Sequence, residues 1–160
     1  MPTRVLREIT PLGEHDFMYV ADRHKKEFDY PIHQHEIFEL NFVVGGAGCL
    51  RVVGDSNEVI GDLDLVLITS PDLEHVWEQN GALTEDIHEV TVQFNMDFDS
   101  PSSPFRTNPF RPIYLMLAKA KRGLAPPHAG TQANCDFIPI LFEMLKWALA
   151  EPQSRPRVSR

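Results

Sequence analysis

The sequence predicts a mainly β fold with α-helices at its C-terminal end. Residues up to about 99 form short apolar runs separated by turn signals, which is typical of β-strands. A proline-rich connector follows from residue 100, and the apolar residues after it recur with the period of a helix. At 160 residues the chain has the length of one ordinary domain. We expect a β domain over 1–99, a helical region over 100–150 and a polar tail or linker over 151–160.

The β domain is predicted from strands of five to twelve residues and from the glycine turns between them. Turn signals stand at residues 45–48, 54–55 and 61–62. Regular spacing of this kind favours a barrel or a sandwich of two sheets. The predicted strands cover residues 5–10, 17–22, 38–44, 49–53, 63–69 and 87–98.

Two helices are predicted after the connector. The first has Asn108 as N-cap and Pro109 at its first position, and it ends at Gly123. The second runs over about 137–150, and Pro139 is tolerated because it falls in the first turn. It carries one apolar face for packing on the β domain and a second apolar stripe, which predicts a homodimer contact unless the first helix covers it. That stripe consists of Phe137, Ile140, Met144 and Trp147.

Composition excludes several classes of protein. Fifteen basic and twenty-three acidic side chains give a net charge of -8, which disfavours binding to nucleic acid or to anionic lipid. The sequence has no apolar run long enough for a membrane span, and residues 1–10 lack the apolar core of a signal peptide. Cys49 and Cys135 are too few and too far apart for a disulfide framework, so we expect two ordinary buried thiols. These features together predict a cytoplasmic protein.

The candidate site is a cluster of polar residues just before and within a predicted strand. His33 and His35 would lie on one face of a strand with Cα atoms roughly 7 Å apart, close enough to share a metal ion. Glu39 would lie roughly 13 Å farther along a flat strand, so it joins them only if the chain bends near Glu36 and Ile37. His75 is a fourth candidate ligand.

Three interpretations of this cluster stay open: a solvated strand end, a polar pocket for an organic ligand, or a site for one divalent metal. Three imidazoles and a carboxylate suit zinc, nickel, iron or copper without choosing among them. If Glu39 points into the barrel, the opposite apolar face, with Phe38, Leu40 and Phe42, must be covered from outside. If that apolar face is the barrel core, Glu39 is exposed and the metal interpretation fails.

Trp77 and the remaining histidines stand outside this cluster. Trp77 follows His75 by two residues and would share its side of a strand, so it either walls a ligand pocket or packs in the core. The remaining histidines are isolated in the sequence, and we expect them to be ordinary surface or hydrogen-bonded residues. They are His15, His24, His88 and His128.

The cluster resembles a known family pattern. The spacing of His33, His35, Glu39 and Gly46 resembles the first cupin motif, which implies a double-stranded β-helix, or jelly-roll barrel. Over nearly its whole length the chain looks similar to the N-terminal sensor domain of AraC-type transcription regulators. The similar segments are 33–35, 38–43, 53–55, 63–68, 75–77 and 92–94, together with the two predicted helices.

The resemblance implies an effector-sensing and dimerising domain with no reaction of its own. A small-molecule effector would bind in the barrel beside His33, His35, Glu39, His75 and Trp77, with or without a metal. DNA would be bound only by a C-terminal domain that these 160 residues do not include. The alternatives are a metal-dependent cupin enzyme, an oxygenase or isomerase, and a stand-alone metabolite-binding cupin.

Overall fold

The computed structural model describes residues 4–13, 16, 18–69, 71, 73–95, 115 and 123. Within these residues the chain forms nine β-strands, most of them four to eight residues long. The strands are β1 (Leu6–Arg7), β2 (Met18–Lys25), β3 (His33–Gln34), β4 (Phe38–Val44), β5 (Leu50–Val53), β6 (Ser56–Val59), β7 (Leu63–Ile68), β8 (His75–Glu78) and β9 (Ile87–Phe94).

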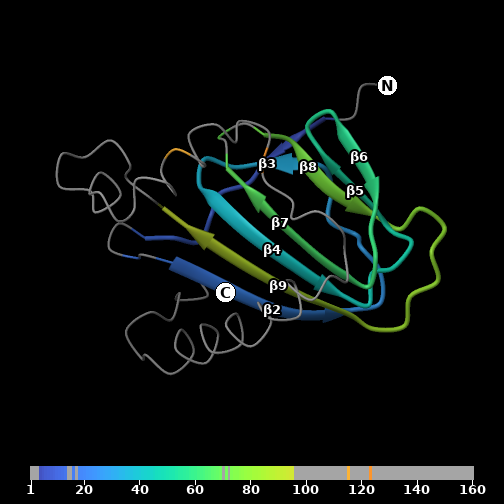
Figure 1. Ribbon diagram of the computed structural model, residues 1–160. Helices are drawn as coiled ribbons and strands as arrows, with labels where there is room; N and C mark the ends of the chain where they lie inside the picture. The colour runs from blue at the N-terminus through green and yellow to red at the C-terminus, as the bar shows by residue number, and fades with distance from the viewer. Residues whose placement is uncertain are drawn as a thin grey trace.

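The strands build two sheets, and the chain crosses repeatedly from one to the other. The five-stranded sheet has the order β1-β3-β8-β5-β6, and the four-stranded sheet has the order β2-β9-β4-β7. In Figure 1, β2, β9, β4 and β7 run side by side, and β3, β8, β5 and β6 lie beyond them. All neighbouring strands are antiparallel except the short pair β1 and β3. Strands that are adjacent in sequence therefore lie mostly in different sheets.

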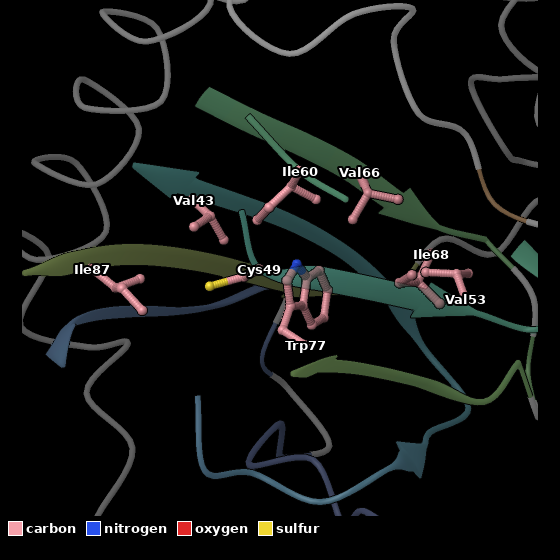
Figure 2. Packing of buried hydrophobic residues seen from close by; sticks show 8 residues of the cluster. All are labelled: Val43, Cys49, Val53, Ile60, Val66, Ile68, Trp77 and Ile87. Atoms are coloured by element: carbon pink, nitrogen blue, oxygen red, sulfur yellow. The ribbon is translucent and has the colours of Figure 1, made fainter. Parts of the chain in front are cut away.

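An apolar core lies between the two sheets. Val43 and Ile87 contribute from the four-stranded sheet, and Val53 and Trp77 from the five-stranded one. Figure 2 shows the Trp77 ring beside Cys49, with Val43 and Ile60 nearby. Cys49 is buried and forms no disulfide, as expected, whereas Cys135 lies outside the described residues. This shared core holds the sheets together at one end of the space between them.

Strand β4 shows which way its side chains point. Val43 lies in the core between the sheets, so Glu39 and Asn41, at two-residue intervals, also face the other sheet. Phe42 and Leu65 face the opposite way and pack with Val90, Val92 and other apolar residues in a second cluster. Phe42 is only 2% exposed. The outward face of the four-stranded sheet is thus buried around Phe42, Val90 and Val92, as the inward orientation of Glu39 requires.

The predicted strands match the observed ones best where the apolar pattern is strong. Strand β4 has the predicted bounds, and β5, β7 and β9 overlap their predicted ranges closely. Strand β2 continues to Lys25, beyond the predicted end at residue 22, because its charged side chains pair along β9. The predicted strand ranges do not include β3, β6 or β8. Strand β3 has two residues, every residue of β6 is exposed, and β8 has only four residues, so none of them shows a long apolar alternation.

The predicted combination of a β domain with C-terminal helices is wrong for this structure. The described residues contain two β-sheets and no helical element. The two predicted helical segments, about 109–122 and 137–150, lie outside the described residues except for Leu115. An apolar period of 3.6 shows which side chains would share a face if a helix formed. Most helical stability in proteins comes from tertiary packing, which this spacing does not contain.

Gly45 ends β4 in a backbone conformation that favours glycine. Its φ is +76°, and a Cβ placed there would lie 2.4 Å from the carbonyl oxygen of Asp86. The Gly45 amide donates to both the backbone and the side chain of Asp62. The turn after β4 therefore packs directly against the segment that leads into β9.

Candidate functional site

Three imidazoles converge where β3 pairs with β8 in the five-stranded sheet. His33 of β3 lies directly opposite His75 of β8 in the strand register. Their ring centroids are 4.1 Å apart, and the His35 ring lies 4.8 Å from that of His75. All three side chains are buried, and one nitrogen from each lies within 4.8 Å of the others. The structure thus brings together the three histidines that the sequence singled out.

Backbone carbonyls orient all three rings in the same way. The Nδ1 atoms of His33, His35 and His75 lie 2.8–3.0 Å from carbonyl oxygens two residues away in the chain. A carbonyl only accepts hydrogen bonds, so each Nδ1 carries a proton and donates it. In a neutral ring this leaves the Nε2 lone pair for another partner. Nε2 of His75 is buried and has no hydrogen-bond partner.

Glu39 joins the imidazoles from the other sheet. The chain bends at Glu36 and Ile37, between β3 and β4, which turns the Glu39 side chain toward the histidines. Its Oε2 lies 3.0 Å from Nε2 of His35 and accepts a hydrogen bond of 2.9 Å from Nε2 of Gln93. Glu39 is only 3% exposed. The carboxylate is therefore held in place by two fixed donors.

The charges of these groups depend on one another. Burial alone would raise the pKa of Glu39, but the hydrogen bond from His35 and the nearby imidazoles lower it to about 2. Burial likewise lowers the pKa of His35, yet Glu39 outweighs this effect and the net pKa is raised. Burial lowers the pKa of His75 to about 4, although Glu39 opposes the change. Near neutral pH the site holds an ionised carboxylate beside a neutral His75.

These residues suit a divalent metal. Imidazoles with Nδ1 bound to the backbone present Nε2 as ligand atoms, once a metal displaces the Nε2 proton that His35 donates to Glu39. The hydrogen bonds to Nδ1 are the second-shell contacts that metal-binding histidines usually make. His33, His35 and His75 form one candidate ligand group, and Glu8, His35 and Glu39 form another. The combined donor set of nitrogen and carboxylate oxygen is one that zinc, nickel, iron and copper all accept.

The site opens into a cavity of about 710 Å³ between the sheets. His33, Glu39 and Trp77 line it, so Trp77 contributes both to the core and to the cavity wall. The four-stranded sheet supplies most of the polar wall, and a loop after β2 adds Phe28 and Tyr30. Besides Glu39, the polar lining residues from this sheet are Tyr19, Asp22, Arg23, His24, Lys25, Asn41, Glu89, Thr91 and Gln93, and Glu8 and Asp29 line the cavity from outside the sheet.

Several polar atoms of this wall are buried without a partner. The carbonyl oxygens of the Asn41 and Gln93 side chains and Nε1 of Trp77 have no hydrogen bond. Asn41 donates to Glu89 and Thr91, which fixes the direction of its amide. Buried polar groups are normally satisfied, so these atoms point to a molecule that would complete them.

One end of the wall is strongly charged. Glu89 is buried and lies 2.6 Å from the ammonium of Lys25, whose Nζ is also 5.1 Å from the centre of the Phe28 ring. The Arg23 guanidinium is more distant from Glu89, at 3.9 Å, and its side chain is half exposed. Two cations lie around this carboxylate, and Asp22 and Asp29 also line the cavity, so charges of both signs meet at its wall.

Asn41, Glu89, Thr91 and Gln93 are residues that the sequence interpretation missed. Strand β9 alternates Glu89, Thr91 and Gln93 with Val90 and Val92, which is the pattern of a strand with one polar face. The sequence could have revealed that face. Only the register, which places Glu39 opposite Gln93 and Asn41 opposite Thr91, shows that the polar face points inward.

The proposed dimer contact of Phe137, Ile140, Met144 and Trp147 lies outside the described residues. No protein-family model matches this chain, and no curated protein is significantly similar to it. The part of the chain that the structure describes contains no helix long and apolar enough to cross a membrane.

Proposed function

We propose that this chain is the sensor domain of an AraC-type transcription regulator, which binds a small polar effector in the cavity between the sheets. The observation that carries the proposal is the cavity itself, of about 710 Å³, with a buried histidine and glutamate cluster at one end and unpaired polar atoms along its wall. Cavities of this volume are typical of small-molecule sites.

The wall favours a particular kind of effector. Two side-chain carbonyl oxygens, from Asn41 and Gln93, are buried and unpaired, so they accept hydrogen bonds from hydroxyl or amine groups of the ligand. The aromatic rings of Phe28, Tyr30 and Trp77 offer apolar faces on the other side. A small ring-shaped or polyhydroxylated molecule satisfies both requirements.

A divalent metal held by His33, His35, His75 and Glu39 is part of the proposal. Such an ion, when bound, supplies a Lewis acid that attracts an oxygen of the effector. The chain's own residues set its position: the backbone carbonyls orient the rings, and Gln93 orients Glu39. The buried, unpaired Nε2 of His75 supports the presence of a further partner at this point.

A matched pair of variants tests the metal. Glu39→Gln removes the buried carboxylate, and Glu36→Gln removes an exposed one three residues earlier that pairs with Arg7. We expect the interior site to take up one equivalent of Zn²⁺, Ni²⁺ or Fe²⁺, with affinity reduced at least tenfold in Glu39→Gln and unchanged in Glu36→Gln. Equal metal uptake by both variants and by His33→Ala/His35→Ala would contradict the metal site.

A ligand screen tests the sensor. Thermal unfolding with a panel of sugars, phenols and hydroxy acids should reveal compounds that raise the midpoint in the native chain but not in Asn41→Leu or Gln93→Leu, because these variants lose the acceptor oxygens. An increase of the unfolding midpoint that is retained in both variants would show that the ligand binds away from Asn41 and Gln93.

The regulator part of the proposal has its own tests. We expect the reading frame beyond Arg160 to encode a basic, helix-rich extension of about a hundred residues, the size of a small domain. We also propose a homodimer in the cytoplasm; light scattering should show a dimer that dissociates in Met144→Glu or Trp147→Glu. A reading frame that ends at Arg160, or a monomer at every concentration, would reject these parts.

A second candidate function is a metal-dependent enzyme, an oxygenase or isomerase. It is favoured by the three convergent Nε2 atoms beside an open cavity, since a catalytic metal keeps a coordination position for its substrate. Turnover of a bound ligand by the metal-loaded protein, abolished in Glu39→Gln, would favour this function over sensing.

A further inference from the structure

A second group of histidines and carboxylates lies on the outward face of the four-stranded sheet. His24 of β2 is directly opposite His88 of β9. In the neighbouring register position, Glu89 of β9 lies opposite Arg23 of β2 on one side and Val43 of β4 on the other. Val43 points into the core between the sheets. Side chains alternate along a strand, so His24 and His88 point away from that core, and Asp22 lies on the same face as His24.

The geometry of this group is compact. The two imidazole rings stack with centroids 4.3 Å apart and planes 10° apart. Nδ1 of His24 lies 3.0 Å from a carboxylate oxygen of Asp86, and Nε2 of His88 lies 2.6 Å from one of Asp22. One ligand atom each from Asp22, His24 and His88 fall within 4.8 Å of one another.

We propose that Asp22, His24 and His88 form a second, surface site for a divalent transition metal, with Asp86 as the residue that orients His24. Ligands about 2.1 Å from a tetrahedral ion are about 3.4 Å from each other, so the ligand atoms must close in by roughly an ångström. The stacked imidazoles must also turn, because each ligand lone pair lies in the plane of its ring. Two imidazoles and a carboxylate suit Cu²⁺, Ni²⁺ and Zn²⁺, with Cu²⁺ the tightest.

The contact between His24 and Asp86 supports this assignment. Metal-binding histidines usually donate their other ring nitrogen to a carboxylate or carbonyl, which fixes the ring. Asp86 is in that position, and the packing of Gly45 against the Asp86 carbonyl fixes its backbone. Three protein ligands also leave one coordination position open to water or to a donor from another molecule.

This site is distinct from the interior cluster because its imidazoles lie on the other face of the sheet, at the edge strand β2, where Asp22 and His24 also border the cavity. The His24 side chain is 61% exposed, that of Asp22 is 41% exposed and that of His88 is 18% exposed. His33, His35 and His75, by contrast, are all buried. An immobilised metal ion can therefore reach the surface group, whereas the interior histidines are screened by the fold.

The test is retention of the full chain on a column of immobilised Cu²⁺, followed by titration with Cu²⁺ in solution. We expect native protein to be retained, and His24→Asn/His88→Asn to elute early and to lose one equivalent of bound Cu²⁺. Asp86→Asn should weaken the affinity about 10–100-fold, the usual effect of removing a second-shell partner. Unfolding curves in EDTA confirm that each variant is folded.

Three controls separate this site from other sources of binding. Glu85→Gln removes the carboxylate next to Asp86, and His128→Asn removes a histidine with no histidine near it in the sequence; neither should change retention. His33→Ala/His35→Ala should also leave retention unchanged, so failure of the interior metal site would not be mistaken for failure here. Native-like retention and stoichiometry in His24→Asn/His88→Asn would overturn the proposal.

Metal binding should also hold β2 to β9. A ligand at one hundred times its dissociation constant that binds only the folded state lowers the unfolding equilibrium constant about a hundredfold. We expect this stabilisation by Zn²⁺ in His33→Ala/His35→Ala, where only the surface group is intact, and its loss when His24→Asn and His88→Asn are added. Equal stabilisation by Zn²⁺ of the variant with two substitutions and the variant with four would overturn the assignment.

Discussion

The buried carboxylate of Glu39 should make the metal-free protein unusually sensitive to loss of one charge. Its pKa falls from 4.5 to about 2 in the folded chain, since hydrogen bonding by His35 and the charge of the nearby imidazoles outweigh the effect of burial. A tenfold change in proton affinity corresponds to about 1.4 kcal/mol. The lowered pKa of Glu39 therefore corresponds to about 3 kcal/mol of folding stability above pH 4.5.

The sign follows from proton binding. Below pH 4.5 the unfolded chain binds a proton at Glu39 that the folded chain does not bind until about pH 2. Stability from this group is therefore complete above pH 4.5 and is lost as the pH falls toward 2. Glu39→Gln should remove about 3 kcal/mol at pH 7, in the range found when one partner of a buried ion pair is deleted.

Urea unfolding in EDTA at pH 7 measures this effect. Glu36→Gln is the matched control, because Glu36 pairs with Arg7 at the surface, where both side chains are mostly exposed, and such pairs contribute at most about 1 kcal/mol. The difference between native protein and Glu39→Gln should shrink as the pH is lowered below 4.5. A Glu39→Gln chain as stable as Glu36→Gln at pH 7 would refute the buried pair.

Three further predictions concern other parts of the fold. In ¹⁵N-resolved NMR of metal-free protein, His75 should stay neutral down to about pH 4 with its proton on Nδ1; titration near pH 6.5 or an Nε2-protonated ring would contradict the observed burial and hydrogen bond. Asp64→Ala should cost about 3–5 kcal/mol in urea unfolding, because it leaves the buried Arg51 guanidinium with only the partly exposed Glu58; a loss below 1 kcal/mol would show that water reaches this pair. Gly45→Ala should cost at least about 1 kcal/mol, since φ is positive and the new Cβ would meet the Asp86 carbonyl; a neutral effect would mean that the 84–86 segment moves freely.

The sequence alone determined the strands that have a strong apolar pattern. Phe38 to Val44 alternates large apolar side chains with Glu39 and Asn41, and β4 forms at those residues. The sequence also singled out His33, His35, Glu39 and His75, because histidines at two-residue spacing share a face of a strand wherever that strand lies. Local periodicity is a property of the chain itself, so it can be recognised without knowledge of the fold.

Tertiary structure decided which face of each strand became the interior. Glu39 points inward because the chain bends at Glu36 and Ile37, and because its register on β9 places it opposite Gln93. A shift of register by one residue would have exposed it. The same register pairs His24 with His88, two histidines 64 positions apart that the sequence treated as isolated.

The helical period after residue 108 is a pattern whose outcome depends on tertiary packing. Spacing of apolar residues predicted helices and a dimer stripe there, and these segments lie outside the described residues except for Leu115. Helices depend on the surface that they pack against, and that surface is a product of the whole fold. Strand pairing between distant segments, such as β2 with β9 and β3 with β8, is likewise set by contacts that no local pattern contains. The sequence therefore named the donor residues of the interior site, and only the pairing of the strands brought them together.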